Sequence, residues 1–428
     1  MCSPVSLIGI LKSALSLLQF FNMITDKLSH KSQWENFLQY KLSGGHITEK
    51  DADDLTRFVK NEEYTSVVCN LCNGGAFGIP SVSYINKGSS GKKRTVFTFS
   101  REENYVQKML SYLLYEYDYL FCDNLYSFRR NTGVKKAVKD LKAVSDLNRK
   151  YSYKTDVSDY FNSVNPAKLI PMLKSALPDE PVFVSCIEKM LLEPSALVNG
   201  KMCEIKKGIM AGVPLASFLA DLYLCELDRR FYERGILYAR YSDDIIVFGN
   251  TKEETEEYRQ IILSTLAELD LGVNPDKECF CEPGQPWSFL GFSFCGETVD
   301  VSAVAVKKLK AKMKRKAAAL VRWRRKKGAS PERAVKAYIR FFNKKFFDNP
   351  YHNEITWCRW FFPVINTEKS LHELDLYMQE CIRFIATEKR SKKRFDYRYE
   401  DMKNLGYTSL VNCFFEFKKN GYYPMMRR

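Results

Sequence analysis

Apolar and polar positions alternate along residues 238–249. Aromatic and β-branched residues stand on both sides of Ser242, Asp243 and Asp244. This pattern predicts two short strands joined by a turn that holds the carboxylates away from the apolar flanks. Adjacent carboxylates repel each other, so a cation is their natural partner.

A second β-rich region lies between residues 64 and 99, where β-forming residues alternate with glycines. The cation-rich segment 86–94 within it predicts a hairpin turn. Elsewhere apolar residues recur at helical spacing, so both kinds of element are expected. The predicted helices cover 1–62, 103–120, 134–147, a long segment that ends near Leu227, 253–271 and 307–327, and a helical stripe follows at Leu371, Leu374, Tyr377, Met378 and Cys381.

Composition adds a bias towards polyanionic partners. The chain has 428 residues, 45% of them hydrophobic, and a formal net charge of +15. This length allows two or three packed subdomains. The charge favours a nucleic acid partner, although a generally basic soluble protein fits the charge alone about as well.

The start of the chain and its cysteines favour a cytoplasmic protein. The apolar stretch 6–21 has no basic leader and is interrupted by Lys12 and Gln19, so we expect an amphipathic helix there and not a signal peptide or a membrane span. The 13 cysteines form no regular framework, which is typical of thiols in a reducing compartment.

An acid upstream of the turn predicts a metal site. The alternating run 151–155 leads into Asp156, which would complete a three-carboxylate site with Asp243 and Asp244. Such a site suits two divalent cations about 4 Å apart, Mg²⁺ or Mn²⁺, which activate a 3′-hydroxyl and stabilise the departing pyrophosphate. We therefore assign catalysis to the three aspartates and expect the backbone carbonyl of Val157 to be a further metal ligand.

The nucleotide pocket is expected beside these acids. A ring at Phe161 can close the pocket beneath the sugar and exclude a 2′-hydroxyl, and a plain core aromatic is the alternative. Asp159 is expected to cap the helix that begins at Tyr160. The hairpin cations suit a triphosphate, and a glycine before a helix lets the backbone approach a base pair closely. The candidate nucleotide-binding residues are Lys92, Lys93, Arg94, Asp159, Tyr160, Phe161 and Gly212.

Further cations and rings are candidates for contact with the substrate. Lys277 is a possible proton donor to pyrophosphate, with a surface lysine as the equal alternative. The helix 307–327 is rich in Lys and Arg and has no acid before Glu332, so it should attract phosphates. The candidate nucleic-acid-binding residues are Arg129, Arg130, Phe289, Gly291, Lys312, Arg315, Arg322, Trp323 and Arg324.

The ordered motifs together resemble a reverse transcriptase. They are the cationic hairpin, Asp156 to Phe161, the glycine-bearing helix start at 206–217, Tyr-Ser-Asp-Asp at 241–244, Asn-Pro-Asp-Lys at 274–277 and Phe-Leu-Gly-Phe at 289–292. The resemblance covers residues 64–295. The segment Tyr126-Ser127-Phe128-Arg129 is similar to the finger segment of the bacterial branch, which includes group II intron and retron enzymes. Within this branch, the chain is most similar to the defence-associated, abortive-infection-like members.

The resemblance implies an α+β right-hand polymerase, with fingers and palm around an antiparallel sheet and an α-helical thumb after them. It also favours Phe161 as a sugar gate. One departure is Met210-Ala211-Gly212, because the family usually has Pro-Gln-Gly there and the glutamine's contact is lost. The implied domains are an N-terminal helical extension at 1–62, fingers at 63–155, a palm with part of the fingers at 156–300, and a basic helical thumb and RNA-binding region at 301–428.

The resemblance therefore implies RNA-directed DNA synthesis from deoxynucleotides with two Mg²⁺ ions. A structured non-coding RNA is the expected template, in anti-phage defence, and no membrane partner is expected. Three alternatives remain open: template-independent, protein-primed DNA synthesis, a non-catalytic RNA-binding scaffold, and an RNA-dependent RNA polymerase, which Phe161 disfavours.

Overall fold

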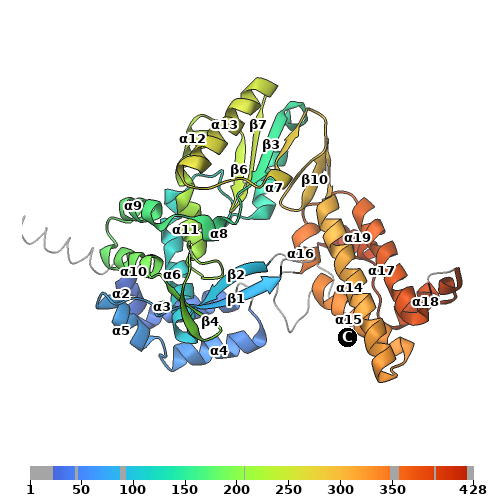
Figure 1. Cartoon of the computed structure of the whole chain (residues 1–428). Coiled ribbons are helices and arrows are strands. Elements are labelled where there is room, and N and C mark those ends of the chain that lie inside the picture. The colour runs from blue at the N-terminus through green and yellow to red at the C-terminus, as the bar shows by residue number, and fades with distance from the viewer. Residues whose placement is uncertain are drawn as a thin grey trace, which may run out of the picture. The chain divides into compact units, whose positions relative to one another are not determined.

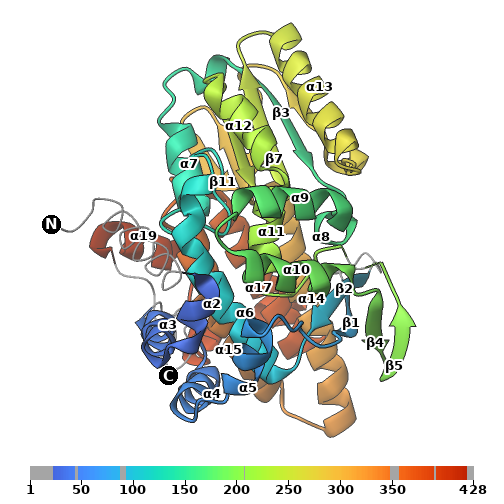
Figure 2. The same cartoon turned by 90° about the vertical axis from the view of Figure 1, so that its left-hand side faces the viewer.

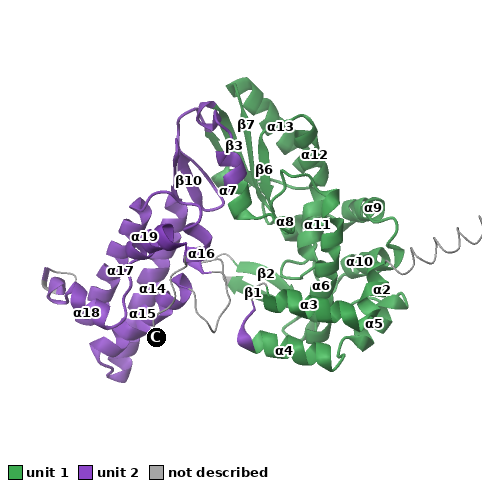
Figure 3. Ribbon diagram, turned by 180° about the vertical axis from the view of Figure 1, so that it is seen from behind, with its two compact units in different colours: residues 1–44, 50–137, 150–280 green, residues 45–49, 138–149, 281–428 purple. Residues whose placement is uncertain are grey.

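The computed structural model describes residues 23–43, 47–86, 93–206, 208–347, 356–389 and 392–421. Figure 3 shows the two compact units into which the chain divides. Unit 1 comprises residues 1–44, 50–137 and 150–280, and unit 2 comprises residues 45–49, 138–149 and 281–428.

Asp156 and Asp244 lie in a four-stranded sheet in the order β6-β7-β3-β8, of which Figure 1 labels β6, β7 and β3. Its strands are β3 (Tyr151–Asp156), β6 (Tyr238–Tyr241), β7 (Asp244–Gly249) and β8 (Cys279–Cys281). Ile245, Ile246 and Val247 of β7 are all fully buried, so this strand is covered on both faces, as its continuous apolar run requires. Helix α13 (Lys252–Glu268) packs against β7 and β3.

A second sheet in unit 1 has the order β2-β1-β4-β5. Strands β1 (Ser81–Asn86) and β2 (Lys93–Thr98) pair antiparallel, while β4 (Ser195–Val198) runs parallel to β1 and pairs with β5 (Lys201–Glu204). The β1–β2 pairing confirms the predicted hairpin. Its tip, with Lys92, lies outside the described residues.

Helices make up the rest of unit 1, and Figure 2 shows them from the side. None of the helices in the described part of the chain has the length and apolar character needed to cross a bilayer. The helices are α2 (Ile24–Ser29), α3 (Lys31–Ser43), α4 (Glu49–Lys60), α5 (Thr65–Cys72), α6 (Arg101–Leu113), η1 (Leu114–Leu120), α8 (Tyr160–Ser163), α9 (Pro166–Ala176), α10 (Pro181–Leu192), α11 (Ala216–Tyr223), α12 (Cys225–Glu233) and η3 (Pro275–Lys277), while α7 (Val134–Lys142) crosses the boundary between the units.

Unit 2 combines a small antiparallel sheet with helices. The sheet has the order β11-β10-β9, and α14 packs against α15 and α17. Its elements are η2 (Leu147–Arg149), β9 (Trp287–Phe289), β10 (Phe292–Cys295), β11 (Thr298–Val301), α14 (Ala303–Lys327), α15 (Pro331–Phe346), α16 (Trp357–Phe361), α17 (Lys369–Thr387), η4 (Lys392–Asp396), α18 (Tyr399–Asn404) and α19 (Leu410–Asn420).

The α+β class, the acidic hairpin and the basic helix are confirmed, and two predicted elements are wrong. Residues 65–72 form helix α5 and not a strand, because Val68 and Leu71 lie on one side of a helix and are buried there. The single long helix predicted to end near Leu227 is broken into α11 and α12, because Leu224 leaves the helical region with φ −110° and ψ 8°.

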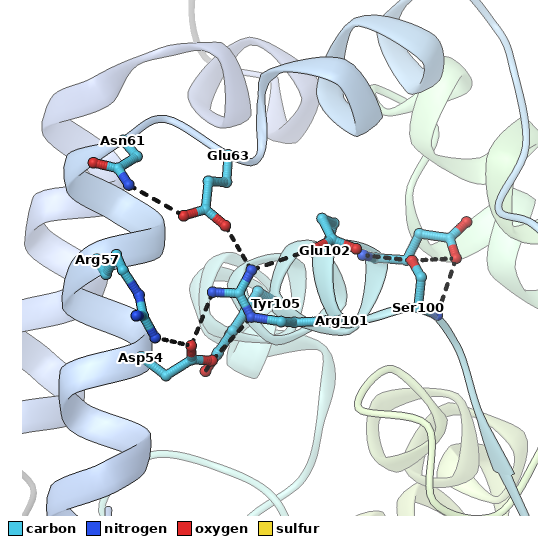
Figure 4. Close-up of polar contacts among 9 residues, drawn as sticks. Asp54, Arg57, Asn61, Glu63, Ser100, Arg101, Glu102 and Tyr105 are labelled. Carbon is cyan, nitrogen blue, oxygen red and sulfur yellow. Dashed lines mark hydrogen bonds and ion pairs between the residues drawn. The ribbon is translucent and has the colours of Figure 1, made fainter.

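Figure 4 shows a charged network that ties α4 to α6. The Arg101 guanidinium donates to both carboxylate oxygens of Asp54, each at 3.0 Å, and to Glu63. The Tyr105 hydroxyl donates to Asp54 at 2.8 Å. These hydrogen bonds, that from Arg101 first, hold the pKa of Asp54 well below its usual range.

We expect Arg101→Met to lower the free energy of unfolding at pH 7 by about 1 kcal/mol, because a two-pronged ion pair is lost at a partly exposed site. A carboxylate with a depressed folded-state pKa stabilises the fold above its unfolded pKa, and this contribution fades below about pH 4. Urea titrations should therefore find the two proteins converging in stability at low pH. Arg57→Met, which removes a more exposed partner of Asp54, is the control and should change stability less. A difference between wild type and Arg101→Met that is the same at pH 7 and pH 3 would refute the assignment.

Candidate active site

The acidic turn between β6 and β7 is short and fixed. Tyr241 and Asp244 are directly opposite each other in the antiparallel register, so Ser242 and Asp243 alone make the reversal. Ser242 has φ of 58°, a left-handed conformation that costs a non-glycine residue free energy. The turn therefore places two successive acidic residues at one end of the sheet.

Asp156, at the end of β3, is the third acid at this end of the sheet. Its register partner is Asp244 on β7. The backbone N–H of Val157 donates to the Asp243 carbonyl at 3.0 Å, and the N–H of Asn274 donates to the Asp156 carbonyl at 2.9 Å. The structure thus brings together the three aspartates that the sequence nominated.

The electrostatics of the three aspartates show an excess of negative charge. Burial, followed by the charges of Asp156 and Asp244, raises the pKa of Asp243 to about 6. The ammonium group of Lys277 lies 2.5 Å from an Asp156 carboxylate oxygen. The ammonium group of Lys154 lies 3.9 Å from an Asp244 carboxylate oxygen. One lysine therefore pairs with Asp156 and another lies near Asp244.

These residues fit a divalent cation in their chemistry. Within the described ranges, no group of three or more His, Cys, Asp and Glu side chains has a metal-holding arrangement, and two of the three acids here pair with lysines. Carboxylate and carbonyl oxygens are nevertheless the donors that hard divalent ions prefer. Burial first, and then the neighbouring carboxylates, raise the pKa of Asp243, and a bound cation would stabilise its ionised form. The lysines are the groups that such an ion would replace.

The predicted sugar gate is held by a tight loop contact. Phe161 lies on α8, is partly exposed, and its carbonyl accepts a hydrogen bond from the Ile209 N–H at 2.8 Å. Gly208 has φ of 54°, and a Cβ on it would lie 2.3 Å from the Phe161 carbonyl oxygen and 2.7 Å from the carbonyl carbon of Asn162. Glycine at position 208 is therefore needed to keep this loop against α8.

The predicted cap at Asp159 is wrong in its chemistry. Asp159 does precede α8, but its side chain makes no capping hydrogen bond, because its backbone is left-handed with φ of 43°. Its carboxylate instead accepts from the Asn162 amide at 3.3 Å. The neighbouring Tyr160 is buried and donates its hydroxyl hydrogen bond to the Ala220 carbonyl.

The glycine predicted to approach the substrate packs against β2. Gly212 has φ of 99°, and a Cβ on it would lie 2.4 Å from a methyl carbon of Val96. The Ala211 carbonyl accepts from the Phe97 N–H at 2.9 Å. On the same strand, the cations Lys93 and Arg94 are exposed. The loop that holds Gly212 therefore packs against the strand that bears Lys93 and Arg94.

The two arginines predicted to contact nucleic acid have different surroundings. The side chain of Arg129 is 10% exposed, and its guanidinium donates to the carbonyls of Cys122, Leu125 and Asp118. Arg130 is exposed, and its guanidinium lies 5.0 Å from the ring centre of Tyr115. Arg129 is therefore engaged in holding its own loop, while Arg130 is open to solvent.

The remaining predicted contacts lie in unit 2. Phe289 is fully buried, while Gly291 follows it in a left-handed turn with φ of 88°. On α14, Arg324 pairs with Glu388. Trp323 lies beneath the Arg333 guanidinium at 5.7 Å. The exposed members of the predicted set on this helix are Arg315 and Arg322, and Lys312 is partly exposed.

Four buried polar residues beneath the acidic turn were missed by the sequence prediction: Ser127, Asp221, Asp228 and Arg240. Their signal was an arginine in a strand that is otherwise apolar or aromatic, and two of the three acids in the predominantly apolar segment 216–228. A charge at a position whose neighbours are buried needs a partner. That rule would have paired Arg240 with an acid without telling which one.

The site gathers three carboxylates at one end of a sheet, and the chain around it can be compared with known families. Residues 85–294 match the family model described as "Reverse transcriptase (RNA-dependent DNA polymerase)". These residues are therefore similar to a reverse transcriptase domain, and such domains in general depend on a divalent metal. Among curated proteins, the chain is 25% identical over 233 residues to the retron Ec86 reverse transcriptase of Escherichia coli, a match that covers 53% of this chain and 66% of that relative.

Solved structures with partial similarity include two telomerases. One is an apo telomerase from Candida tropicalis truncated from its C-terminal domain, with a TM-score of 0.42 and 14% identity over 53% of this chain and 55% of that chain. The other is a telomerase from Candida albicans in complex with a fragment of telomeric RNA, with a TM-score of 0.40 and 12% identity over 82% of this chain and 68% of that chain.

Proposed function

We propose that this protein is an RNA-directed DNA polymerase that builds DNA from deoxynucleotides. The observation that carries the proposal is the convergence of Asp156, Asp243 and Asp244 at one end of an antiparallel sheet, inside a reverse transcriptase domain. In this proposal the fingers are residues 63–155, the palm is 156–300 and the thumb is 301–428.

The three aspartates and the Val157 carbonyl would hold two Mg²⁺ ions. Such ions activate the primer hydroxyl and stabilise the charge of the departing pyrophosphate. Lys277 pairs with Asp156 in the metal-free protein. Once displaced by a metal ion, its ammonium group would be suited to meet the negative charge of the leaving group. Phe161 fits beneath the sugar, where its ring would exclude a 2′-hydroxyl.

The proposed nucleotide pocket takes its remaining groups from β2, from the loop that holds Gly212 and from the start of α8. Lys93 and Arg94 are exposed cations on β2, which suits them to a triphosphate. Gly212, whose loop packs against the same strand, would let the backbone approach the new base pair. Asp159 and Tyr160 directly precede Phe161 at the start of α8.

We propose a structured non-coding RNA as the partner and template, in cytoplasmic anti-phage defence. The charge of +15 and the exposed Arg315 and Arg322 on α14 support an RNA backbone as ligand. The defence role follows the resemblance to abortive-infection-like enzymes. The test is to purify the protein, sequence the RNA that copurifies, and supply Mg²⁺ and deoxynucleotides. DNA complementary to that RNA is the expected product, and the absence of DNA synthesis on it or on a generic primed RNA would refute the proposal.

The second candidate is template-independent, protein-primed synthesis by the same site. It is favoured by Ala211, which offers no side-chain amide where the family usually has a glutamine, and whose carbonyl is already bonded to Phe97. Sequencing the product separates the two candidates. A product of defined, copied sequence supports templated synthesis, whereas a sequence independent of any RNA, joined to a protein hydroxyl, supports the alternative.

Phe161→Ala should raise ribonucleotide incorporation relative to deoxynucleotide incorporation. We expect a rise on the order of 10- to 100-fold in the ratio of kcat/KM values, the usual range for a single steric contact. Single-nucleotide extension with matched dNTP and rNTP measures it. Phe161→Tyr retains the ring and should keep the wild-type preference. An unchanged ratio in Phe161→Ala would assign the ring to packing alone.

A further inference from the structure

Arg240 is a fully buried arginine in β6, two residues before Ser242. Its guanidinium forms a two-pronged pair with Asp228 of α12, with Nε at 2.8 Å from one oxygen and Nη2 at 2.6 Å from the other. Asp228 is also fully buried. The pair is therefore shielded from solvent and fixed in direction.

A second buried acid, Asp221 of α11, completes the surroundings of the guanidinium. Its carboxylate lies 3.5 Å from Nη1 of Arg240, and its carbonyl accepts from Nη2 at 3.0 Å. The Ser127 hydroxyl donates to the same carboxylate at 2.8 Å. Ser127 is thereby oriented by the acid that faces the arginine.

Both ends of this network reach the backbone of Ser242. Nη1 of Arg240 donates to the Ser242 carbonyl at 3.2 Å, and the Ser242 N–H donates to the Ser127 hydroxyl at 2.9 Å. Ser242 is the residue with φ of 58°. A left-handed serine persists when its surroundings hold it there, and here both of its peptide groups are held by side chains.

We propose that Ser127, Asp221, Asp228 and Arg240 form a positioning network that fixes the left-handed backbone of Ser242 and so aims the carboxylates of Asp243 and Asp244. The four residues act through the Ser242 backbone and do not contact substrate. The inference rests on the proposed function, since it assigns the aimed carboxylates to metal binding.

Stability alone does not account for this arrangement. A buried ion pair can often be replaced by apolar side chains of similar volume without loss of stability. Apolar groups would not supply the donor for the Ser242 carbonyl or the acceptor for its N–H. The directional bonds to a strained residue beside the acids are the feature that a purely structural pair would lack.

The test compares Ser127→Ala with Ser127→Thr and Tyr238→Phe. Ser127→Ala removes the acceptor for Ser242 and leaves the Arg240–Asp228 pair intact, so the fold should survive. Ser127→Thr keeps a hydroxyl. Tyr238→Phe deletes a hydrogen bond to Asp228 at 3.0 Å and leaves every bond to Ser242 in place, which makes it the control for a loss of buried polar contact.

Two measurements are made on each full-length variant: Mn²⁺ affinity by calorimetry, and kcat and KM for one deoxynucleotide. A carboxylate misplaced by about 1 Å can cost about 100-fold in rate, so Ser127→Ala should lower kcat by about 10- to 100-fold and weaken Mn²⁺ binding by about tenfold. Ser127→Thr should recover most of both, and Tyr238→Phe should match wild type. Wild-type Mn²⁺ affinity and kcat in Ser127→Ala, measured per folded molecule, would overturn the inference. Failure of the wild type itself to bind Mn²⁺ and to polymerise would instead overturn the proposed function.

Discussion

Replacing both acids of the turn, Asp243→Ala with Asp244→Ala, should abolish DNA synthesis. Metal ions at such sites supply several kcal/mol of transition-state stabilisation, so the rate should fall by at least about a thousandfold. Primer extension on a primed RNA template with Mg²⁺ and deoxynucleotides measures the loss. Asp276→Ala, which removes an exposed acid from the turn next to Lys277, is the matched control and should remain close to wild type. A double variant that polymerises normally would show that these acids do not hold the catalytic metals.

Removing the charge of Asp243 should abolish activity, but it should not destabilise the metal-free fold at neutral pH. Because the folded state raises the pKa of Asp243 from 3.8 to about 6, its ionised form destabilises the metal-free fold above that pH, and the penalty disappears below about pH 4. Asp243→Asn should therefore unfold at the same or a higher temperature than wild type at pH 7.5 without metal, and lose this advantage as the pH falls from 6 to 4. A lower melting temperature of Asp243→Asn at pH 7.5 would contradict this prediction. The loss of DNA synthesis in variants of the acidic turn would then reflect misfolding.

Gly208→Ala is expected to have the second-largest effect. The added Cβ would meet the backbone of Phe161 and Asn162 at 2.3–2.8 Å, so the loop and α8 must separate. A left-handed alanine and an overpacked contact together should cost about 2–4 kcal/mol of stability. Displacement of Phe161 by about 1 Å should lower kcat/KM for deoxynucleotides by roughly 100-fold. Chemical denaturation and single-nucleotide kinetics measure the two effects.

Gly235→Ala is the control that separates backbone strain from collision. Gly235 has φ of 62°, close to that of Gly208, but a Cβ there would meet nothing within 4 Å. Gly235→Ala should therefore show only the strain, about 1–2 kcal/mol, with unchanged kinetics. Equal kinetics in both variants would show that the contact between Gly208 and α8 does not position the nucleotide pocket.

Local patterns predicted the elements that their own residues determine. The alternation around the acidic turn predicted β6 and β7, and the strand pattern before Asp156 predicted β3. Residues 65–72 misled because Val67 and Val68 favour strands, whereas tertiary packing buries one side of a helix there. The break at Leu224 was hidden because an apolar run has the same appearance whether one helix or two cover it.

The acids of the site were predictable and their supporting residues were not. Asp156, Asp243 and Asp244 stand in motifs whose order along the chain resembles that of reverse transcriptases. The partners of Arg240 depend on where α11 and α12 pack, which no local spacing encodes. Arg129 shows the converse, since a cation in a promising motif is turned onto the carbonyls of its own loop. Charge and motif therefore identify candidate groups of the site. The partner of each group depends on tertiary packing and is harder to predict.

The most direct test of the central claim is an anomalous-scattering measurement on crystals of the protein soaked with Mn²⁺ and a deoxynucleotide. We expect Mn²⁺ bound between Asp156 and Asp243, with Asp244 beside it, and no such signal in Asp156→Asn crystals. Mn²⁺ bound elsewhere, with Asp156 still paired to Lys277 and Asp244 to Lys154, would contradict this expectation.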